Sequence, residues 1–362
     1  MKKVGLLTFH RSCSYGASLQ AYATVEFIKE HGYDIEIVDY TNPYEQRFEK
    51  KIYSENGKLS GYFSVFIKNV FFKKSHYARL AFGNMTQYYP VSKDRYRSKD
   101  ALKNVEYDIL VAGSDQIWNR NITDGLDEVM LLQFGKAEKR ISLASSMGSI
   151  ILNNNEKETF RRSFRSFSSI SVREEHGRKQ LQPLTDKTIK LLMDPTFLFS
   201  REEWIQKLGG KSKYYKKTES YILTYFVAPN RTYRTRTEEF AKKFGLPVWS
   251  IQPTTFKRIK CKKSILGARI EDLIALIANA DLVLTDSFHG VAMSLNLHSD
   301  FVAFKNEGNP IRVISLLEKL EIPERVNMKP SLYNSVDYKK VDNVLEPLRA
   351  DSQKWVIEAL ES

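Results

Sequence analysis

LVLTDSFHG, residues 282–290, is the stretch of sequence that decides the fold. An apolar run, Leu282 to Leu284, leads into a polar turn, and a helix-like segment follows from Val291 to Leu297. This order predicts a strand, a tight turn and a helix N-terminus. In α/β sheets ligands bind at the carboxyl ends of strands, and helix N-termini favour anions. His289 is therefore placed to contact a phosphate or transfer a proton; the alternative is a capping turn with an incidental histidine.

Two further segments show the same order of an apolar run and a polar turn. Residues 108–119, DILVAGSDQIWN, begin as an apolar strand and become polar after Ala112. Residues 4–23, VGLLTFHRSCSYGASLQAYA, begin with a strand from Val4 to Phe9 and reach a helix at about Ala17. These turns, like the one at His289, are places where polar side chains follow a buried strand.

Strand-like and helix-like runs alternate along the chain. The predicted strands are 4–9, 34–39, 108–112, 140–145, 169–173, 189–193, 220–227, 247–251, 282–286 and 300–304. The predicted helices are 17–31, 59–72, 155–167, 232–244, 270–279, 290–297, 310–321 and 351–360. This alternation predicts an α/β fold of two halves, each with a parallel sheet and crossover helices. The lysine-rich stretch from Gly209 to Glu219 is the expected boundary between them.

The composition is that of a globular protein with anionic partners. A chain of 362 residues, 42% hydrophobic and 27% charged, is long enough for two domains. Two isolated cysteines, Cys13 and Cys261, favour a reducing cytosol over a disulfide framework. The first residues lack the apolar run of a signal peptide, so we expect a cytoplasmic location. The net charge of +13 favours phosphorylated substrates, anionic lipids or nucleic acid, but no nucleic-acid motif is present.

A long insertion, about 42–104, separates the second and third predicted strands. Within it, residues 61–74 combine aromatic and aliphatic residues with Lys68, Lys73 and Lys74. A helix of this composition can lie at the cytoplasmic face of the inner membrane, or it can pack as ordinary core. The sequence favours the second alternative and leaves the first open.

Taken together, these segments resemble the polysaccharide pyruvyl transferase family. The resemblance also includes ISVREEHG (170–177), MDPTFL (193–198) and NAD (279–281), and it spans residues from about 4 to about 320. It implies two Rossmann-like domains facing a cleft, the arrangement called GT-B: residues 1–200, with the insertion, on the acceptor side and 201–350 on the donor side. Residues 351–362 are expected as a helix that crosses back to the first domain or packs on the second.

The resemblance implies transfer of the enolpyruvyl group of phosphoenolpyruvate onto a sugar of a bacterial cell-surface polysaccharide precursor. A cyclic pyruvate ketal forms and phosphate leaves, with no further cofactor and no metal. The donor carries a carboxylate and a phosphate, so cations must hold it, and its methylene carbon needs a general acid. The acceptor is a sugar or oligosaccharide, with polyprenyl-diphosphate linkage left open, as are the acceptor's identity and the oligomeric state.

The donor residues implied by the resemblance surround the motif histidine. His289 is the expected acid, and Arg173 matches the family's arginine, with a surface ion pair to Glu174 or Glu175 as the alternative. Many relatives carry an arginine where this chain has Ser287. Its replacement is sought among cations near strand ends or a helix start: Arg312, Lys305, His10 and Arg11. The full expected donor set is Arg173, Ser287, Phe288, Gly290, Lys305 and Arg312.

The acceptor residues are expected in the two N-terminal segments. Asp115 is the second expected catalytic residue, orienting an acceptor hydroxyl, unless it caps the following helix. Trp118 is expected to stack on a sugar ring or to be a core residue, and the core alternative is favoured. Asp286 is expected to cap the helix after its strand. The expected acceptor set is His10, Arg11, Tyr15, Gly16, Gln20, Gly113, Ser114, Gln116 and Trp118.

Two other functions remain open from sequence alone. A GT-B glycosyltransferase using a nucleotide sugar would share the fold, so the fold cannot decide between them. It would need an acidic residue for ribose hydroxyls, for which Glu307 is the one weak candidate. A non-catalytic scaffold in polysaccharide assembly is the third reading, kept open by the absence of the motif arginine at Ser287.

Overall fold

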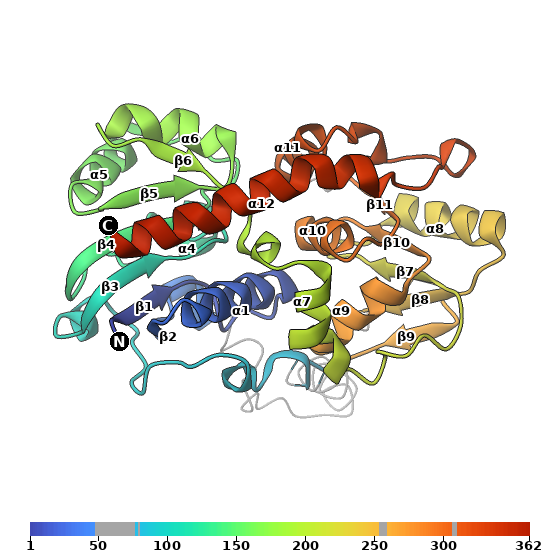
Figure 1. Ribbon diagram of the computed structural model, residues 1–362, viewed down its shortest axis with the longest axis horizontal. Coiled ribbons are helices and arrows are strands. Elements are labelled where there is room, and N and C mark those ends of the chain that lie inside the picture. Colours follow the sequence, from blue (N-terminus) through green and yellow to red (C-terminus); the bar gives the residue numbers. More distant parts are fainter. Residues whose placement is uncertain (48–76, 79, 253–258, 306–309) are drawn as a thin grey trace, which may run out of the picture. The chain divides into compact units, whose positions relative to one another are not determined.

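The computed structural model describes residues 1–47, 77–78, 80–252, 259–305 and 310–362. These residues form two compact units (Figure 1). Unit 1 comprises Met1–Ile52, Met85–Leu198 and Glu346–Ser362, and unit 2 comprises Tyr53–Asn84 and Phe199–Leu345, in each case as far as the structure describes them. The segment 61–74 and Glu307 lie outside the described residues.

Unit 1 is built on a six-stranded sheet in which every neighbouring pair is parallel. The strand order is β2-β1-β3-β4-β5-β6. The strands are β1 (Lys3–Leu7), β2 (Asp34–Ile37), β3 (Glu106–Ala112), β4 (Lys136–Ser145), β5 (Ser169–Val172) and β6 (Ile189–Leu191). The helices are α1 (Tyr15–Glu30), α4 (Arg120–Thr123), α5 (Asn154–Phe164) and α6 (Glu175–Leu181). Strand residues 109–112 are buried, as expected of a parallel sheet covered on both faces.

Unit 2 contains a five-stranded sheet, also with parallel neighbours, in the order β11-β10-β7-β8-β9. Its strands are β7 (Ile222–Tyr225), β8 (Val248–Ile251), β9 (Lys263–Ile265), β10 (Leu282–Thr285) and β11 (Phe301–Ala303). Its helices are α7 (Arg201–Lys207), α8 (Arg231–Phe244), α9 (Ile270–Asn279), α10 (Phe288–Asn296) and α11 (Pro310–Lys319). Because all strands run the same way, their carboxyl ends lie at one edge of the sheet and their amino ends at the other.

The last helix, α12 (Tyr338–Glu361), is much longer than the predicted 351–360 and contains Pro347. Its first residues belong to unit 2 and its last to unit 1. In unit 1, the Lys139 ammonium donates to the carbonyls of Leu360 at 3.2 Å and Glu361 at 2.8 Å. A lysine thus binds the otherwise unpaired carbonyls at the end of this helix.

The predicted strands and helices are confirmed wherever the structure describes them, with shifted ends. Among the described residues, the short elements that the sequence missed include β9, α4, α6 and α7. β9 was hidden because its three residues continue a lysine-rich run. The predicted helix 59–72 lies outside the described residues.

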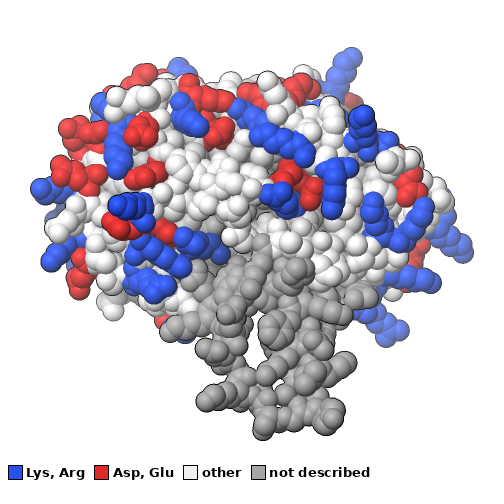
Figure 2. Space-filling model, turned by 90° about the horizontal axis from the view of Figure 1, so that it is seen from below, with Lys and Arg blue, Asp and Glu red and all other residues white. Residues whose placement is uncertain are grey.

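Basic side chains are interspersed with acidic ones on the face shown in Figure 2. The excess of positive charge is therefore spread over that face. Within the part of the chain that the structure describes, no helix has the length and apolar character needed to cross a membrane.

Candidate functional site

The segment after β10 forms the predicted strand, turn and helix. Ser287 is the N-cap of α10, and its hydroxyl accepts a hydrogen bond from the Gly290 N–H at 3.3 Å. The Ser287 N–H donates to the Thr285 hydroxyl, which donates to the Tyr225 carbonyl at 2.6 Å. Serine therefore has a structural use at the position where the resemblance led us to expect an arginine: it begins the helix.

Gly290 allows α10 to begin directly against β10. A Cβ placed on Gly290 would lie 2.3 Å from Oγ1 and 3.0 Å from Cβ of Thr285. The first distance is shorter than any ordinary contact, so only glycine fits without movement. This packing against Thr285 is sufficient to explain why residue 290 is a glycine. The contact with the donor that the sequence predicts for Gly290 stays a prediction.

The ring of Phe288 lies next to two of the predicted donor-site residues, His289 and Arg312. The His289 side chain is buried, and its ring meets the Phe288 ring edge to face, with centroids 5.2 Å apart. The guanidinium of Arg312, on α11, lies 5.3 Å from the centroid of the same Phe288 ring. Lys305 is exposed two residues after β11, the strand next to β10. Unit 2 therefore gathers one histidine and two cations near the carboxyl edge of its sheet.

Asp286 does not cap α10, and that prediction is wrong. Its carboxylate accepts hydrogen bonds from the N–H groups of Val227 at 2.6 Å and Ala228 at 3.0 Å, which fastens the end of β7 to the end of β10. Burial raises the pKa of Asp286, and these two N–H groups oppose the rise. Burial also raises the pKa of the neighbouring Tyr225 to about 12, so this phenol stays protonated at neutral pH.

In unit 1, the loop after β1 places His10 and Arg11 on the same carboxylate. Nε2 of His10 lies 3.0 Å from Oδ1 of Asp39, and Nε of Arg11 donates to that oxygen at 2.6 Å. Nη2 of Arg11 donates to the other carboxylate oxygen. Burial alone would raise the pKa of Asp39, but hydrogen bonds from Arg11 and His10 hold it well below its usual range. Asp39 thus orients Arg11, whose side chain is 32% exposed and can still contact a ligand.

A buried ion pair between Arg173 and Asp194 contacts the loop after β3. Arg173 donates to Asp194 and to the Ser114 hydroxyl, the latter at 3.2 Å, and also contacts the Glu174 carboxylate at 3.2 Å. Burial alone would lower the pKa of Arg173, but the carboxylates of Glu174, Asp194 and Asp115 raise it. The Arg173 side chain is 3% exposed. The expected alternative was an ion pair on the surface, but the pair between Arg173 and Glu174 is buried. These contacts favour a role for Arg173 in holding the Ser114-Asp115 loop.

Asp115 itself adopts a left-handed backbone, with φ of 67°. Its carboxylate accepts a hydrogen bond from the Gln116 N–H at 2.8 Å, and its carbonyl accepts one from Ser146. It does not cap the following helix, since the N-cap of α4 is Asn119. A strained backbone at a loop that follows a strand is typical of functional sites.

Arg11 and Asp115 line one pocket of unit 1, with a volume of about 260 Å³. Its wall mixes hydroxyl, charged and apolar side chains: Phe9, Arg11, Ser12, Cys13, Ser14, Tyr44, Glu45, Asp115 and Ile122. Carboxylates accept hydrogen bonds from hydroxyl groups, and an apolar wall suits the carbon face of a ring. The pocket is close to the lower end of the size range of small-molecule sites.

Several predicted acceptor residues are used for internal contacts. Trp118 is fully buried, donates to the Met130 carbonyl at 3.0 Å and packs edge to face on Phe160. It is therefore a core residue, the alternative that the sequence favoured over stacking on a sugar. Gln20 is also fully buried and donates to the Thr8 hydroxyl at 2.9 Å, which links α1 to the segment after β1. The remaining predicted residues with internal positions are Tyr15 and Gly16, buried in α1, Gly113, buried against Thr8, and Gln116, which accepts from Asn119.

The sequence missed most of the pocket wall. Tyr44 and Glu45 belong to the insertion, about 70 residues before Asp115, and no local pattern brings them there. Ser14 did carry a signal, since a serine before a helix predicts an N-cap, and its hydroxyl accepts from the Ala17 N–H. Among the described residues, no three His, Cys, Asp or Glu side chains form a group that suits a metal ion.

Comparisons with known proteins find one matching family model and several similar solved structures. The model of the family described as polysaccharide pyruvyl transferase matches residues 15–308. No curated protein matches the chain. One similar solved structure is the UDP-GlcNAc 2-epimerase of Neisseria meningitidis bound to UDP-GlcNAc, at 10% identity and a TM-score of 0.49, covering 99% of each chain. Another is the UDP-GlcNAc 2-epimerase of Methanocaldococcus jannaschii, at 12% identity and a TM-score of 0.48, covering 100% of this chain and 99% of that one.

Proposed function

Because the chain belongs to the polysaccharide pyruvyl transferase family, we propose that it moves the enolpyruvyl group of phosphoenolpyruvate onto a sugar of a bacterial cell-surface polysaccharide precursor. The match to the family over residues 15–308 is the observation that carries this proposal. The reaction takes place in the cytoplasm, and its product is a cyclic pyruvate ketal on the sugar.

The donor binds at the carboxyl edge of the unit 2 sheet. Phosphoenolpyruvate has its phosphate and its carboxylate on the same carbon, so it needs cations within a few ångströms of one another. Arg312, fixed against Phe288, takes the place of the arginine that is absent at Ser287, and Lys305 supplies a second positive charge. The N-terminus of α10 adds a favourable dipole for an anion.

The acceptor binds in the pocket of unit 1 that Arg11 and Asp115 line. Asp115 accepts a hydrogen bond from an attacking hydroxyl and so orients its oxygen. Glu45, on the same wall, accepts from a neighbouring hydroxyl. The apolar side chains Phe9 and Ile122 contact the carbon face of the sugar ring.

The chemistry requires one proton to be delivered and two to be removed. His289 donates a proton to the methylene carbon of the donor, which becomes the methyl group of the ketal. The first sugar oxygen bonds to the central carbon and loses its proton. The bond from that carbon to the phosphate oxygen then breaks, and the second sugar oxygen takes its place. One of the two hydroxyl protons restores the acid and the other leaves with phosphate, so the atoms balance.

Incubation of the full chain with phosphoenolpyruvate and candidate glycans or glycan-lipids tests the proposal. Phosphate release must accompany a glycan whose mass increases by one pyruvate less one water. Phosphoenolpyruvate should raise the melting temperature, as does any ligand that binds only the native state, and uridine, guanosine and cytidine diphosphate sugars should raise it much less. A large shift with a nucleotide sugar and none with phosphoenolpyruvate would favour a glycosyltransferase instead.

A further inference from the structure

Unit 2 contains a polar pocket at the opposite edge of its sheet from His289. The pocket has a volume of about 300 Å³. Tyr221 directly precedes β7, Trp249 is the second residue of β8 and Lys263 is the first of β9. These are the amino ends of parallel strands, whereas His289 follows the carboxyl end of β10. The pocket is therefore separate from the proposed donor site. Its wall consists of Lys213, Tyr214, Lys216, Lys217, Thr218, Tyr221, Trp249, Lys263 and Asn279.

The loop that forms one wall of this pocket is held in place without a ligand. The Asn279 side chain, at the end of α9, donates to the carbonyls of Tyr214 at 2.8 Å and Tyr215 at 2.9 Å. Lys217 pairs with Asp281 at 3.0 Å. The floor is rigid as well, because the rings of Tyr221 and Trp249 stack with centroids 4.2 Å apart and an interplanar angle of 7°. A preformed pocket lowers the entropy cost of binding.

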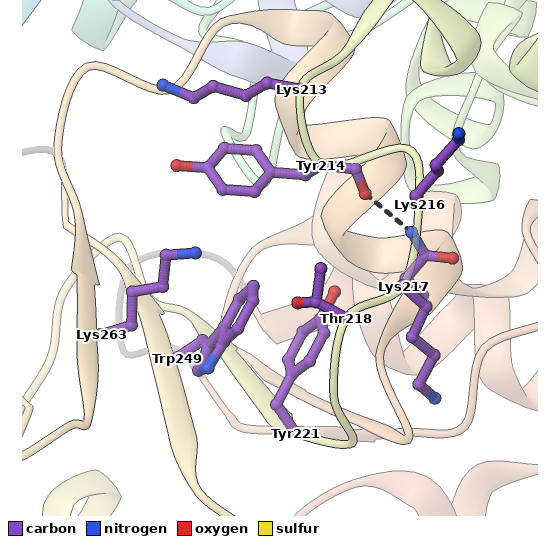
Figure 3. A pocket seen from close by; sticks show the side chains of 9 residues that line it. Lys213, Tyr214, Lys216, Lys217, Thr218, Tyr221, Trp249 and Lys263 are labelled. Atoms are coloured by element: carbon purple, nitrogen blue, oxygen red, sulfur yellow. Dashed lines mark hydrogen bonds between the residues drawn. The ribbon is translucent and has the colours of Figure 1, made fainter.

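Two ammonium groups converge on a single tyrosine ring. Nζ of Lys213 lies 5.2 Å and Nζ of Lys263 4.9 Å from the centroid of the Tyr214 ring, and Lys263 also lies 3.9 Å from the Trp249 ring. Figure 3 shows both ammonium groups on the side of the loop to which the Tyr214 hydroxyl points. Lys216 and Lys217 extend from the loop toward the other side.

No carboxylate side chain belongs to the wall of this pocket. The nine wall residues include four lysines and no Asp or Glu. Within the described part of the chain, no carboxylate lies within ion-pair distance of Lys213 or Lys263, and the nearby Asp281 and Glu219 are paired with Lys217 and Lys262. Lys262 is the main cause of the lowered pKa of Glu219, and the charge of Lys263 contributes to it. Two like charges beside one ring repel each other, and an anion between them removes that repulsion.

We propose that this pocket binds a diphosphate group, with its oxygens between the ammonium groups of Lys213 and Lys263 and the hydroxyl of Tyr214. Lysine is a point charge that suits the tetrahedral phosphate, whereas the planar carboxylate is better matched by the arginine fork, which this wall lacks. A diphosphate has oxygens on two phosphorus atoms and can therefore accept from both lysines at once. The site is independent of the proposed transferase activity.

Calorimetric titration of the full chain with inorganic pyrophosphate tests the site. We expect saturable binding that weakens by about tenfold or more in the double variant Lys213→Gln/Lys263→Gln, since charge-assisted hydrogen bonds to both phosphates are lost. The matched control, Lys242→Gln/Lys329→Gln, removes the same charge from exposed positions of unit 2 and should change the affinity by less than about twofold. Melting temperatures of both variants establish that they are folded.

Three results would overturn the proposal. The first is no saturable binding to the wild type. The second is an equal loss in the control variant, which would reduce the effect to net charge. The third is a loss caused by Lys305→Gln and not by the pocket variant, which would place pyrophosphate at the carboxyl edge of the sheet. Glucose 1-phosphate should bind more weakly than pyrophosphate, and tighter binding would contradict a diphosphate site.

Discussion

Replacement of Arg173 by methionine should destabilise unit 1 and leave donor binding nearly unchanged. The Asp194 side chain is fully buried, and Arg173 supplies its compensating charge. Removal of one partner of a buried ion pair costs about 3–5 kcal/mol. At about 2–4 °C per kcal/mol for a unit of this size, the melting temperature should fall by roughly 6–20 °C.

The measurement has two parts, thermal unfolding and phosphoenolpyruvate affinity at a temperature where the variant is folded. The affinity should stay within about threefold of wild type, because the arginine is bound to internal groups. Arg178→Met is the matched control, since Arg178 pairs with Glu175 on the exposed part of α6 and its loss should not measurably change the melting temperature. An unchanged melting temperature together with a tenfold weaker affinity would refute the reasoning and return Arg173 to the donor site.

Three further changes test other parts of the structure. His289→Asn should lower turnover by about 10²-fold or more with an unchanged melting temperature, because it removes the acid but little volume; near wild-type turnover would exclude that role. Gly290→Ala should cost about 1–3 kcal/mol in urea unfolding, since its methyl group would overlap Thr285, and Thr285→Ala should recover part of that loss in the double variant. Asp39→Asn should lower the melting temperature most near neutral pH: the folded pKa of Asp39 is depressed, so its stabilisation is present above the ordinary aspartate pKa and disappears as pH falls below about 4. A pH-independent difference would contradict the assigned cause.

The elements of the fold were predictable where local pattern and burial coincide. The β10–α10 segment combines an apolar run with a polar turn, and both signals lie within ten residues, although the sequence assigned the helix cap to Asp286 and not to Ser287. β9 was missed because Lys263, Ser264 and Ile265 alternate too briefly to be distinguished from a charged loop. α6 and α7 have seven residues each, too few for a clear helical period.

The candidate site was less predictable because most of its contacts are long-range. The sequence identified Arg11 and Asp115, each in the loop that follows a strand, and the structure brings them into one pocket. It could not show that Tyr44 joins them from the insertion. Arg173 and Trp118 have the residue types of a binding site, but their roles depend on whether their side chains are covered, which the local sequence does not specify. The pocket of unit 2 that contains Lys213 and Lys263 was likewise not predictable, because its wall is assembled from the amino ends of three strands that are far apart in the sequence.

The discontinuity of unit 1 along the chain has a consequence for synthesis. A growing chain leaves the ribosome from its N-terminus, and domains tend to fold as they emerge. The first two segments of unit 1 are complete at Leu198, yet the part of α12 that belongs to it is made only after all of unit 2. Val356 and Leu360 are buried in the folded protein. The apolar surface that they cover is therefore exposed to solvent while the roughly 150 residues between Leu198 and Glu346 are translated. Nascent chains stalled before Glu346 should accordingly be better substrates for chaperones than the released protein is.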